Sequence, residues 1–249
     1  MNAAMPDRVD FAVVGAQKAG TRALRAFLMQ HPQIGLPHTL QEAHFFDKQA
    51  AVAARGDYAP YHAMYTEQAL SRCTGDITPI YMYRDGCLEG LSRYNPSIKI
   101  IALLRDPSER AYSQWIMQTE KNQESRAFLP ALLHEARYLR THGQHPNFSY
   151  IQRGFYDHQI ARIQALFPPE SCLFLRTEEL RNHHHRSLER IYRFLGVDDT
   201  DLPAPRAVHA RDYAAMPDRI RRILVSVFHK DITRLEARLG WDLSAWKAT

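Results

Sequence analysis

Residues 9–28, VDFAVVGAQKAGTRALRAFL, decide the fold of this chain. The run Phe11–Val14 is aromatic and β-branched, which predicts a buried strand. Further along, Leu24, Phe27 and Leu28 recur at the spacing of one helix face. The stretch therefore predicts a strand, a short loop and an amphipathic helix in that order.

The loop between the predicted strand and helix has the features of an anion-binding site. Gly15 and Gly20 let the backbone turn tightly and approach a ligand. A helix that starts at Thr21 would turn free N–H groups and the positive end of its dipole toward the loop. Lys18 adds a charge and Thr21 a hydroxyl. We expect a phosphate-like ligand here; a turn that only packs against the core is the alternative.

This loop is not a Walker A motif, in which a lysine follows the second glycine directly. Thr21 holds that place, and the lysine lies inside the loop. We find no companion acidic strand end that would complete an Mg²⁺ site of the kind kinases use. The bound group is therefore expected to need no metal.

Three motifs in order resemble those of PAPS-dependent sulfotransferases, where PAPS is 3′-phosphoadenosine 5′-phosphosulfate. They are GAQKAGT from Gly15, QEAHFF from Gln41 and RDPSERAYS from Arg105. The resemblance is to the heparan sulfate sulfotransferase type and its small bacterial relatives. It implies an α/β fold, a P-loop-like doubly wound central parallel sheet flanked by helices, in a single domain over residues 1–249.

The resemblance also implies the roles of particular residues. The loop would hold the 5′-phosphosulfate, and Lys18 would neutralise charge on the departing phosphate oxygen. Arg105 and Ser113 would hold the 3′-phosphate, and Arg153, in an R-G-x-Y element, is a further candidate for the donor's phosphates. The donor-binding residues predicted in this way are Gly15, Gln17, Lys18, Ala19, Gly20, Thr21, Arg22, Arg105, Ser113 and Arg153.

The segment before Arg105 supports its place in a site. Residues 97–104, SIKIIALL, predict a central parallel strand. Asp106 and Pro107 then carry the signals of a helix N-cap and first helical position. Arg105 would thus lie at the carboxyl end of a strand, where open α/β sheets bind ligands. Ser113 follows about two helical turns later.

Glu42 and His44, which lie two residues apart, are the two candidates for the general base. A carboxylate or an imidazole close to the acceptor oxygen can take the hydroxyl proton. The resemblance favours Glu42, whereas imidazole is the more usual proton acceptor near neutral pH. From the residues alone, a solvated glutamate and a structural histidine are the simpler interpretation. Glu42 and His44 both stay candidate catalytic residues.

Two lysines of the family pattern are absent from this chain. Gln41 precedes the glutamate, and Ile77 follows Asp76 in the element that resembles E-K-[ST]-P-x-Y. In the family the second lysine lies near the transferring sulfate or an acidic sugar, so its loss argues against a glycosaminoglycan acceptor. We expect a hydroxyl on a small molecule, glycan or glycolipid. Residues 120–150 are a candidate lid or acceptor-binding insertion.

Composition limits the function classes. The 249 residues, 45% of them apolar, can bury one substantial core. The formal net charge is +5 and most of the 32 basic residues are arginines, which suits recognition of phosphate or sulfate. The basic residues are dispersed and match no nucleic-acid-binding pattern, so no nucleic-acid partner is expected. No signal peptide or long apolar run occurs, so we expect a cytoplasmic protein without stable membrane insertion.

The cysteines and histidines do not predict a metal site, and the loop before Thr21 leaves two rival functions open. The three cysteines are scattered, and the consecutive residues 183–185, all histidine, cannot face one ion from a regular helix, so they predict a solvated turn. One rival is an ATP-dependent small-molecule kinase, which predicts Mg²⁺ dependence and no use of a 3′-phosphate. The other is a non-catalytic nucleotide-binding module, which predicts binding without turnover.

Overall fold

The computed structural model describes residues 8–37, 41–68, 72–199, 202–204 and 214–248. The Cα positions divide the chain into two compact units. Unit 1 comprises residues 1–104 and 162–210, and unit 2 comprises residues 105–161 and 211–249. The sheet belongs to unit 1, whereas the described elements of unit 2 are helices.

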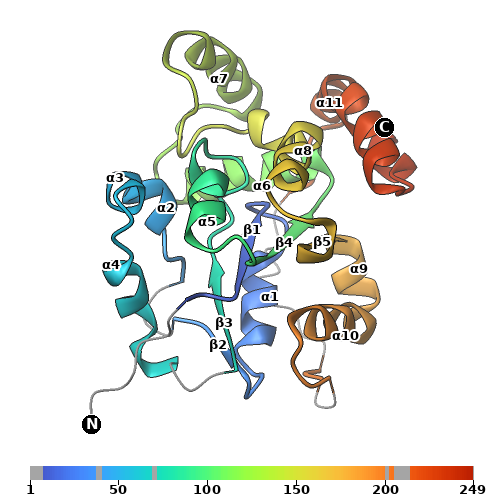
Figure 1. The fold of residues 1–249 in the computed structure, drawn as a ribbon. Helices are drawn as coiled ribbons and strands as arrows, with labels where there is room; N and C mark the ends of the chain where they lie inside the picture. Colours follow the sequence, from blue (N-terminus) through green and yellow to red (C-terminus); the bar gives the residue numbers. More distant parts are fainter. Residues whose placement is uncertain (1–7, 38–40, 69–71, 200–201, 205–213, 249) are drawn as a thin grey trace. The chain divides into compact units, whose positions relative to one another are not determined.

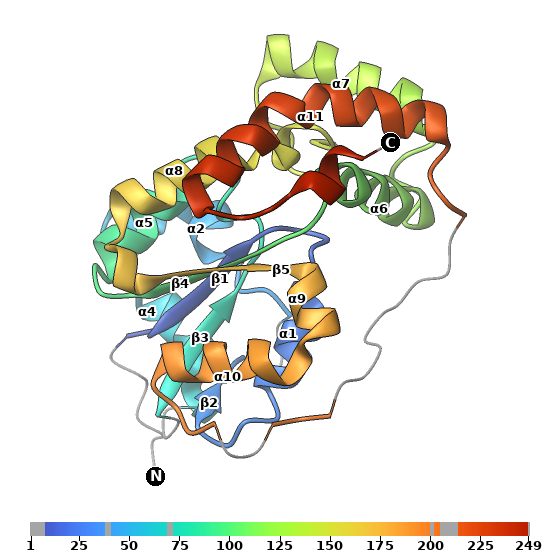
Figure 2. The ribbon, with the colours of Figure 1, turned by 90° about the vertical axis from the view of Figure 1, so that its right-hand side faces the viewer.

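Unit 1 is built on a sheet of five strands, all paired in parallel (Figures 1 and 2). Sequence order and spatial order differ, because the first strand is central and the chain adds strands on both sides of it. This parallel sheet, flanked by helices, confirms the predicted α/β fold class. In spatial order the strands are β2 (Ile34–Gly35), β3 (Cys73–Ile77), β1 (Phe11–Gly15), β4 (Lys99–Leu104) and β5 (Cys172–Arg176).

Helices cover both faces of this sheet (Figures 1 and 2). One face carries α1 (Thr21–Leu28), α9 (Thr177–Asn182) and α10 (His184–Leu195). The other face carries the helices between β2 and β4, which are α2 (Phe45–Lys48), α3 (Ala50–Ala54), α4 (Ala59–His62) with the 3-10 helix η1 (Ala63–Gln68), and α5 (Cys87–Tyr94). A further 3-10 helix, η3 (Pro169–Ser171), precedes β5.

The sequence of unit 1 explains this burial. Every residue of β1 and β3 is buried, as expected of parallel strands covered on both faces. Helix α1 buries Leu24, Phe27 and Leu28 and exposes Arg22, which confirms the predicted amphipathic helix. At the end of β1, a Cβ on Gly15 would fall 1.7 Å from the sulfur of Met82, so a larger residue there would require the Met82 side chain to move.

Unit 2 contains α6 (Pro107–Glu120), α7 (Phe128–His142), the 3-10 helix η2 (Gln152–Gly154), α11 (Asp218–Leu239) and the 3-10 helix η4 (Ser244–Lys247). Helix α8 (Tyr156–Leu166) begins in unit 2 and ends in unit 1. Helix α6 packs against α7, α11 and η2. In the described part of the chain, no helix is long and apolar enough to span a bilayer.

Two local expectations from the sequence were wrong. The sequence suggests an amphipathic helix whose apolar face carries Leu129, Leu132, Leu133, Ala136 and Leu139. Leu132 is buried as expected, but the exposed fraction of Leu133 is 57%, and Phe128 and Ala131 are buried in its place. The expected solvated turn at residues 183–185 is the start of α10, where His184 is buried against Phe27. In both places tertiary packing, rather than local spacing, decides which side chain is covered.

Candidate functional site

The loop between β1 and α1 is tied to its surroundings by hydrogen bonds within unit 1. The Ala16 N–H donates to the Leu103 carbonyl at 2.6 Å. The Thr177 hydroxyl donates to the carbonyls of Ala19 at 2.6 Å and Leu104 at 3.0 Å. Because these bonds reach β4 and its end, the loop is held at the carboxyl edge of the sheet, where doubly wound folds bind ligands.

The start of α1 is open to an anion. Gly20, the N-cap residue, has a φ of 95°, a conformation that favours glycine. No side chain caps α1 and its first turn holds no acidic residue, so its first N–H groups can serve an outside acceptor. Thr21 is buried there, and Lys18 in the loop has a positive φ of 72°. The predicted phosphate cradle thus has the required backbone form.

The two candidate catalytic residues lie in direct contact. The Nε2 atom of His44 is 3.0 Å from Oε2 of Glu42, and its Nδ1 atom is 3.0 Å from Oδ2 of Asp47. The side chains of His44 and Glu42 are 26% and 24% exposed, whereas that of Asp47 is 8% exposed. The imidazole therefore bridges a buried carboxylate and one that solvent can reach.

This bridge decides the protonation state of His44. The hydrogen bonds with Asp47 first and Glu42 second raise the pKa of His44 to about 9, against the opposing effect of its partial burial. At neutral pH both ring nitrogens carry hydrogen and donate, so the ring has no lone pair with which to accept a proton. The Oε1 atom of Glu42 makes no hydrogen bond with the described residues and can accept one.

A buried acid and a threonine hold the segment that carries this bridge. The Thr78 hydroxyl donates to Oδ1 of Asp76 at 2.6 Å and accepts the N–H groups of Ala43 at 3.1 Å and His44 at 3.4 Å. Tyr61 donates its hydroxyl to Oδ2 of Asp76 at 2.8 Å. Burial raises the pKa of Asp76 to about 6. These bonds fix the backbone on which Glu42 and His44 stand.

Unit 1 brings the cradle and the bridge together. Arg22, in the first turn of α1, donates from Nη2 to Oε1 of Gln41 at 2.9 Å, next to Glu42. The Thr78 N–H donates to the Val13 carbonyl of β1 at 3.2 Å. The predicted loop and the QEAHFF motif are therefore neighbours at one edge of the sheet.

Sequence reasoning missed Asp47 and Thr78 as parts of this site. Asp47 lies three residues after His44 at the start of α2, a spacing that places two side chains on one helical face. Thr78 directly precedes Pro79 after a strand, where a hydroxyl often bonds to nearby backbone. The contacts of Thr78 with residues 43 and 44 join segments far apart in the chain, and no local pattern predicts such a contact.

In unit 2, Arg105 and Ser113 stand on either side of the start of α6. The Asp106 side chain caps α6 by accepting from the N–H groups of Ser108 at 2.8 Å and Glu109 at 3.3 Å, as predicted. Nη2 of Arg105 lies 3.5 Å from Oε2 of Glu109. Ser113 is buried. The binding of a 3′-phosphate by Arg105 and Ser113 stays a prediction.

Arg153 is enclosed within unit 2. Its exposed fraction is 3%, and its guanidinium donates to the Pro146 carbonyl. Its own carbonyl accepts from Nε2 of Gln159 at 3.3 Å. These contacts hold η2 in place, and a role for Arg153 with the donor's phosphates stays a prediction. His209 and Arg211 stand where many relatives carry a K-G loop that closes over the donor, and residues 208–213 lie outside the described residues.

No group of three or more histidine, cysteine, aspartate or glutamate side chains in the described ranges is arranged to hold a metal ion. Cys73 and Cys87 are buried and Cys172 is half-buried, and all three are free thiols. The two features that unit 1 brings together are the predicted phosphate cradle and the carboxylate–imidazolium–carboxylate bridge of Glu42, His44 and Asp47.

Comparison with known proteins identifies relatives of this chain. The sequence profile of the sulfotransferase domain matches residues 8–216. The bifunctional heparan sulfate N-deacetylase/N-sulfotransferase 4 of Mus musculus is 29% identical over 199 residues, 75% of this chain and 22% of that protein. Heparan sulfate glucosamine 3-O-sulfotransferase 3B1 of the same species is 28% identical over 187 residues, 74% of this chain and 45% of that protein. The chain thus spans less than half the length of these curated relatives.

A solved structure shares the fold over nearly the whole chain. The crystal structure of a sulfotransferase from Alicyclobacillus acidocaldarius superposes with a TM-score of 0.84 and is 27% identical in sequence. The match covers 97% of this chain and 99% of that one.

We predict that His44 titrates near pH 9 and that its titration affects stability. Because its pKa in the folded state lies above the ordinary 6.5, the pairing stabilises the fold fully below pH 6.5, and this stabilisation is lost as pH rises through about 9. NMR titration of the imidazole C–H signals should give the pKa, and denaturation in urea across this range should show the loss.

Asp47→Asn removes the carboxylate that raises the pKa of His44 most, so the pKa of His44 should fall in this variant. His44→Gln should remove the corresponding part of the pH dependence of stability. A His44 that titrates near 6.5 in the wild-type protein would show that the bridge does not form in solution.

Proposed function

The chain belongs to the sulfotransferase domain family, and on that premise we propose that it transfers the sulfuryl group of PAPS to a hydroxyl group. The products are a sulfate ester and 3′-phosphoadenosine 5′-phosphate. The acceptor is a small molecule or a carbohydrate. The observation that carries the proposal is the Glu42–His44–Asp47 bridge beside the loop that precedes α1.

The cradle fits the phosphate end of such a donor. The open N–H groups at the start of α1 and the positive end of its dipole favour an anion. Lys18 and Thr21 supply an ammonium and a hydroxyl, and the backbone of Gly15, Gln17, Ala19 and Gly20 completes the loop. Sulfotransferases use PAPS, and no metal is needed in this assignment.

Glu42 is the proposed general base. Its Oε1 atom accepts the acceptor's hydroxyl proton while the hydroxyl oxygen forms a bond to sulfur. The bond between sulfur and the bridging phosphate oxygen breaks, and Lys18 neutralises the charge that develops on that oxygen. His44 holds Glu42 through Oε2 and stays protonated throughout. Positioning and fixed positive charge supply most of the rate enhancement, without a covalent intermediate.

The acceptor is proposed to be uncharged near the reacting hydroxyl. Gln41, in the place of a family lysine, bonds to Arg22. Ile77, in the place of the other lysine, is buried and apolar. With neither ammonium present, a highly sulfated or carboxylated acceptor would lack two of its partners. The cytoplasmic location expected from the sequence stays a prediction.

Substitution of Glu42 and of His44 should show which of the two residues is the base. Glu42→Gln keeps the shape but cannot take a proton, so we predict a loss of turnover of about 10²- to 10⁴-fold with donor binding retained. His44→Asn should be milder, because it only loosens the carboxylate. Turnover at saturating donor and acceptor measures both effects.

A matched control is Glu170→Gln, which makes the same chemical change on an exposed residue of η3 in the same unit. It should retain wild-type turnover. If His44→Asn is inactive while Glu42→Gln turns over normally, the base is assigned to the wrong residue.

Recognition of the 3′-phosphate should depend on Arg105 and Ser113. Arg105→Gln or Ser113→Ala should weaken binding of 3′-phosphoadenosine 5′-phosphate by about 1.5–3 kcal/mol for each charged hydrogen bond lost. Binding of adenosine 5′-phosphate should change little. Calorimetry with both nucleotides measures the difference.

Arg126→Gln serves as the control for charge, since Arg126 is an exposed arginine of unit 2 that pairs with Glu124. It should leave both affinities unchanged. Equal losses for the two nucleotides in the Arg105 and Ser113 variants would show that this pair does not read the 3′-phosphate.

A further inference from the structure

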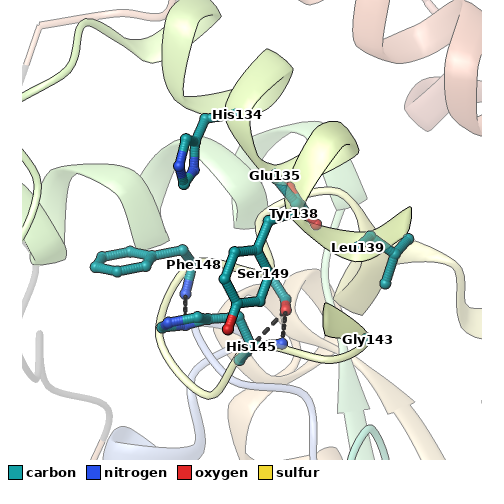
Figure 3. Close-up of a pocket in the computed structure, with 8 residues that line it drawn as sticks. All are labelled: His134, Glu135, Tyr138, Leu139, Gly143, His145, Phe148 and Ser149. Carbon is teal, nitrogen blue, oxygen red and sulfur yellow. Dashed lines mark hydrogen bonds between the residues drawn. The ribbon is translucent and has the colours of Figure 1, made fainter. Parts of the chain in front are cut away.

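Unit 2 contains a pocket that the sulfuryl-transfer proposal does not use. It lies between the second half of α7 and residues 143–149 and has a volume of about 170 Å³ (Figure 3). A cavity of roughly 150 Å³ in another protein holds one benzene molecule. The pocket therefore has the size of a single six-membered ring.

Aromatic rings form the walls of this pocket. The ring of Tyr138 stacks on that of His142 with centroids 4.5 Å apart, and meets the edge of His145 at 5.0 Å. His145 in turn stacks on Phe148 at 4.5 Å. Tyr138, His145 and Phe148 surround the same space in Figure 3. Such walls favour a flat ring that can stack on one face and meet the edge of another.

Residues 145–149, which form one wall of the pocket, are held in place by hydrogen bonds among themselves. Nδ1 of His145 accepts from the N–H groups of Asn147 at 3.0 Å and Phe148 at 3.1 Å. Since these backbone groups can only donate, the imidazole is neutral with its hydrogen on Nε2. The Ser149 hydroxyl donates to the backbone carbonyl of His145 at 2.8 Å and accepts from the backbone N–H of His145 at 3.2 Å. The wall is thus formed before any ligand binds.

A buried carboxyl group at the pocket disfavours an anion. Glu135, which lines the pocket, is 5% exposed. Burial raises the pKa of the Glu135 carboxyl, against the effect of two backbone hydrogen bonds, in which its oxygens accept the N–H groups of Ile151 at 2.7 Å and Gln152 at 2.9 Å. Both oxygens act as acceptors and offer no hydrogen to a carboxylate on the ring, so a neutral ring is preferred.

Two polar groups at the pocket remain to bind a ligand. The Tyr138 hydroxyl and the ring nitrogens of His134 make no hydrogen bond with the described residues, and Figure 3 shows both side chains directed toward the pocket. Two such groups can serve one hydroxyl, as donor and acceptor, but not the several hydroxyls of a sugar. We propose that this pocket binds a neutral aromatic ring that carries one hydroxyl group.

Binding to the whole 249-residue chain can be measured with a matched set of probes. These are p-cresol, toluene, 4-methylbenzoate and methyl β-glucoside, followed by the amide NMR shifts of residues 134–149. We expect p-cresol to bind saturably and more tightly than the other three. Tyr138→Phe should lower the affinity for p-cresol about fivefold, as expected for one lost hydrogen bond, and leave the affinity for toluene unchanged.

Leu139→Trp fills the pocket and should abolish the shifts caused by p-cresol. Leu133→Trp is its control, because it makes the same change on an exposed position of the same helix and should bind p-cresol like the wild type. Thermal unfolding of each variant checks that it is folded. Equal binding by Leu139→Trp, tighter binding of 4-methylbenzoate or the glucoside, or no saturable binding of p-cresol would overturn the proposal. None of these measurements depends on PAPS or on turnover.

Discussion

The site depends on the imidazolium of His44, which is held between two carboxylates. A histidine with Asp47 at one nitrogen and Glu42 at the other gains more from its partners than partial burial costs it, so its pKa rises to about 9. The ring then acts as a fixed cation and a double donor. Glu42 is held through Oε2, and Oε1 is left to take a proton. The pairing leaves Glu42, and not His44, with an acceptor atom for a proton, which supports the proposal that Glu42 is the base.

The framework beneath the bridge explains why it holds its position. The hydroxyl of Thr78 makes three hydrogen bonds: it donates to Asp76 and accepts from the N–H groups of Ala43 and His44. Asp76 and Thr78 are both buried. Removal of either side chain would leave a polar atom of the other without this hydrogen bond, which would lower the stability of the fold. The same β3 extension bonds to the Val13 carbonyl of β1. The proposed base, Glu42, and the predicted phosphate loop are therefore positioned by two adjacent strands of one sheet.

The part of the site that the sequence predicted is the part with a local signal. The β1–loop–α1 unit follows from the apolar run at Phe11, the glycines and the helical spacing, and the capping of α6 follows from Asp106 and Pro107. The order of motifs predicted the α/β class. Thr78 and Asp47 were missed because their roles depend on contacts made after folding. The exposure of Leu133 was likewise decided by how α7 packs, which spacing alone does not encode.

The most direct test of metal-independent sulfuryl transfer uses PAPS whose sulfur atom carries a label and follows the transfer of that label to an acceptor. The measurement uses wild-type protein and Lys18→Ala, with a chelator present and a set of alcohols, sugars and phenols as acceptors. The account predicts that label reaches an acceptor without metal and that Lys18→Ala lowers the rate by about 10²- to 10³-fold while it remains folded. Transfer that requires Mg²⁺, or that proceeds equally well without the Lys18 ammonium, would contradict it.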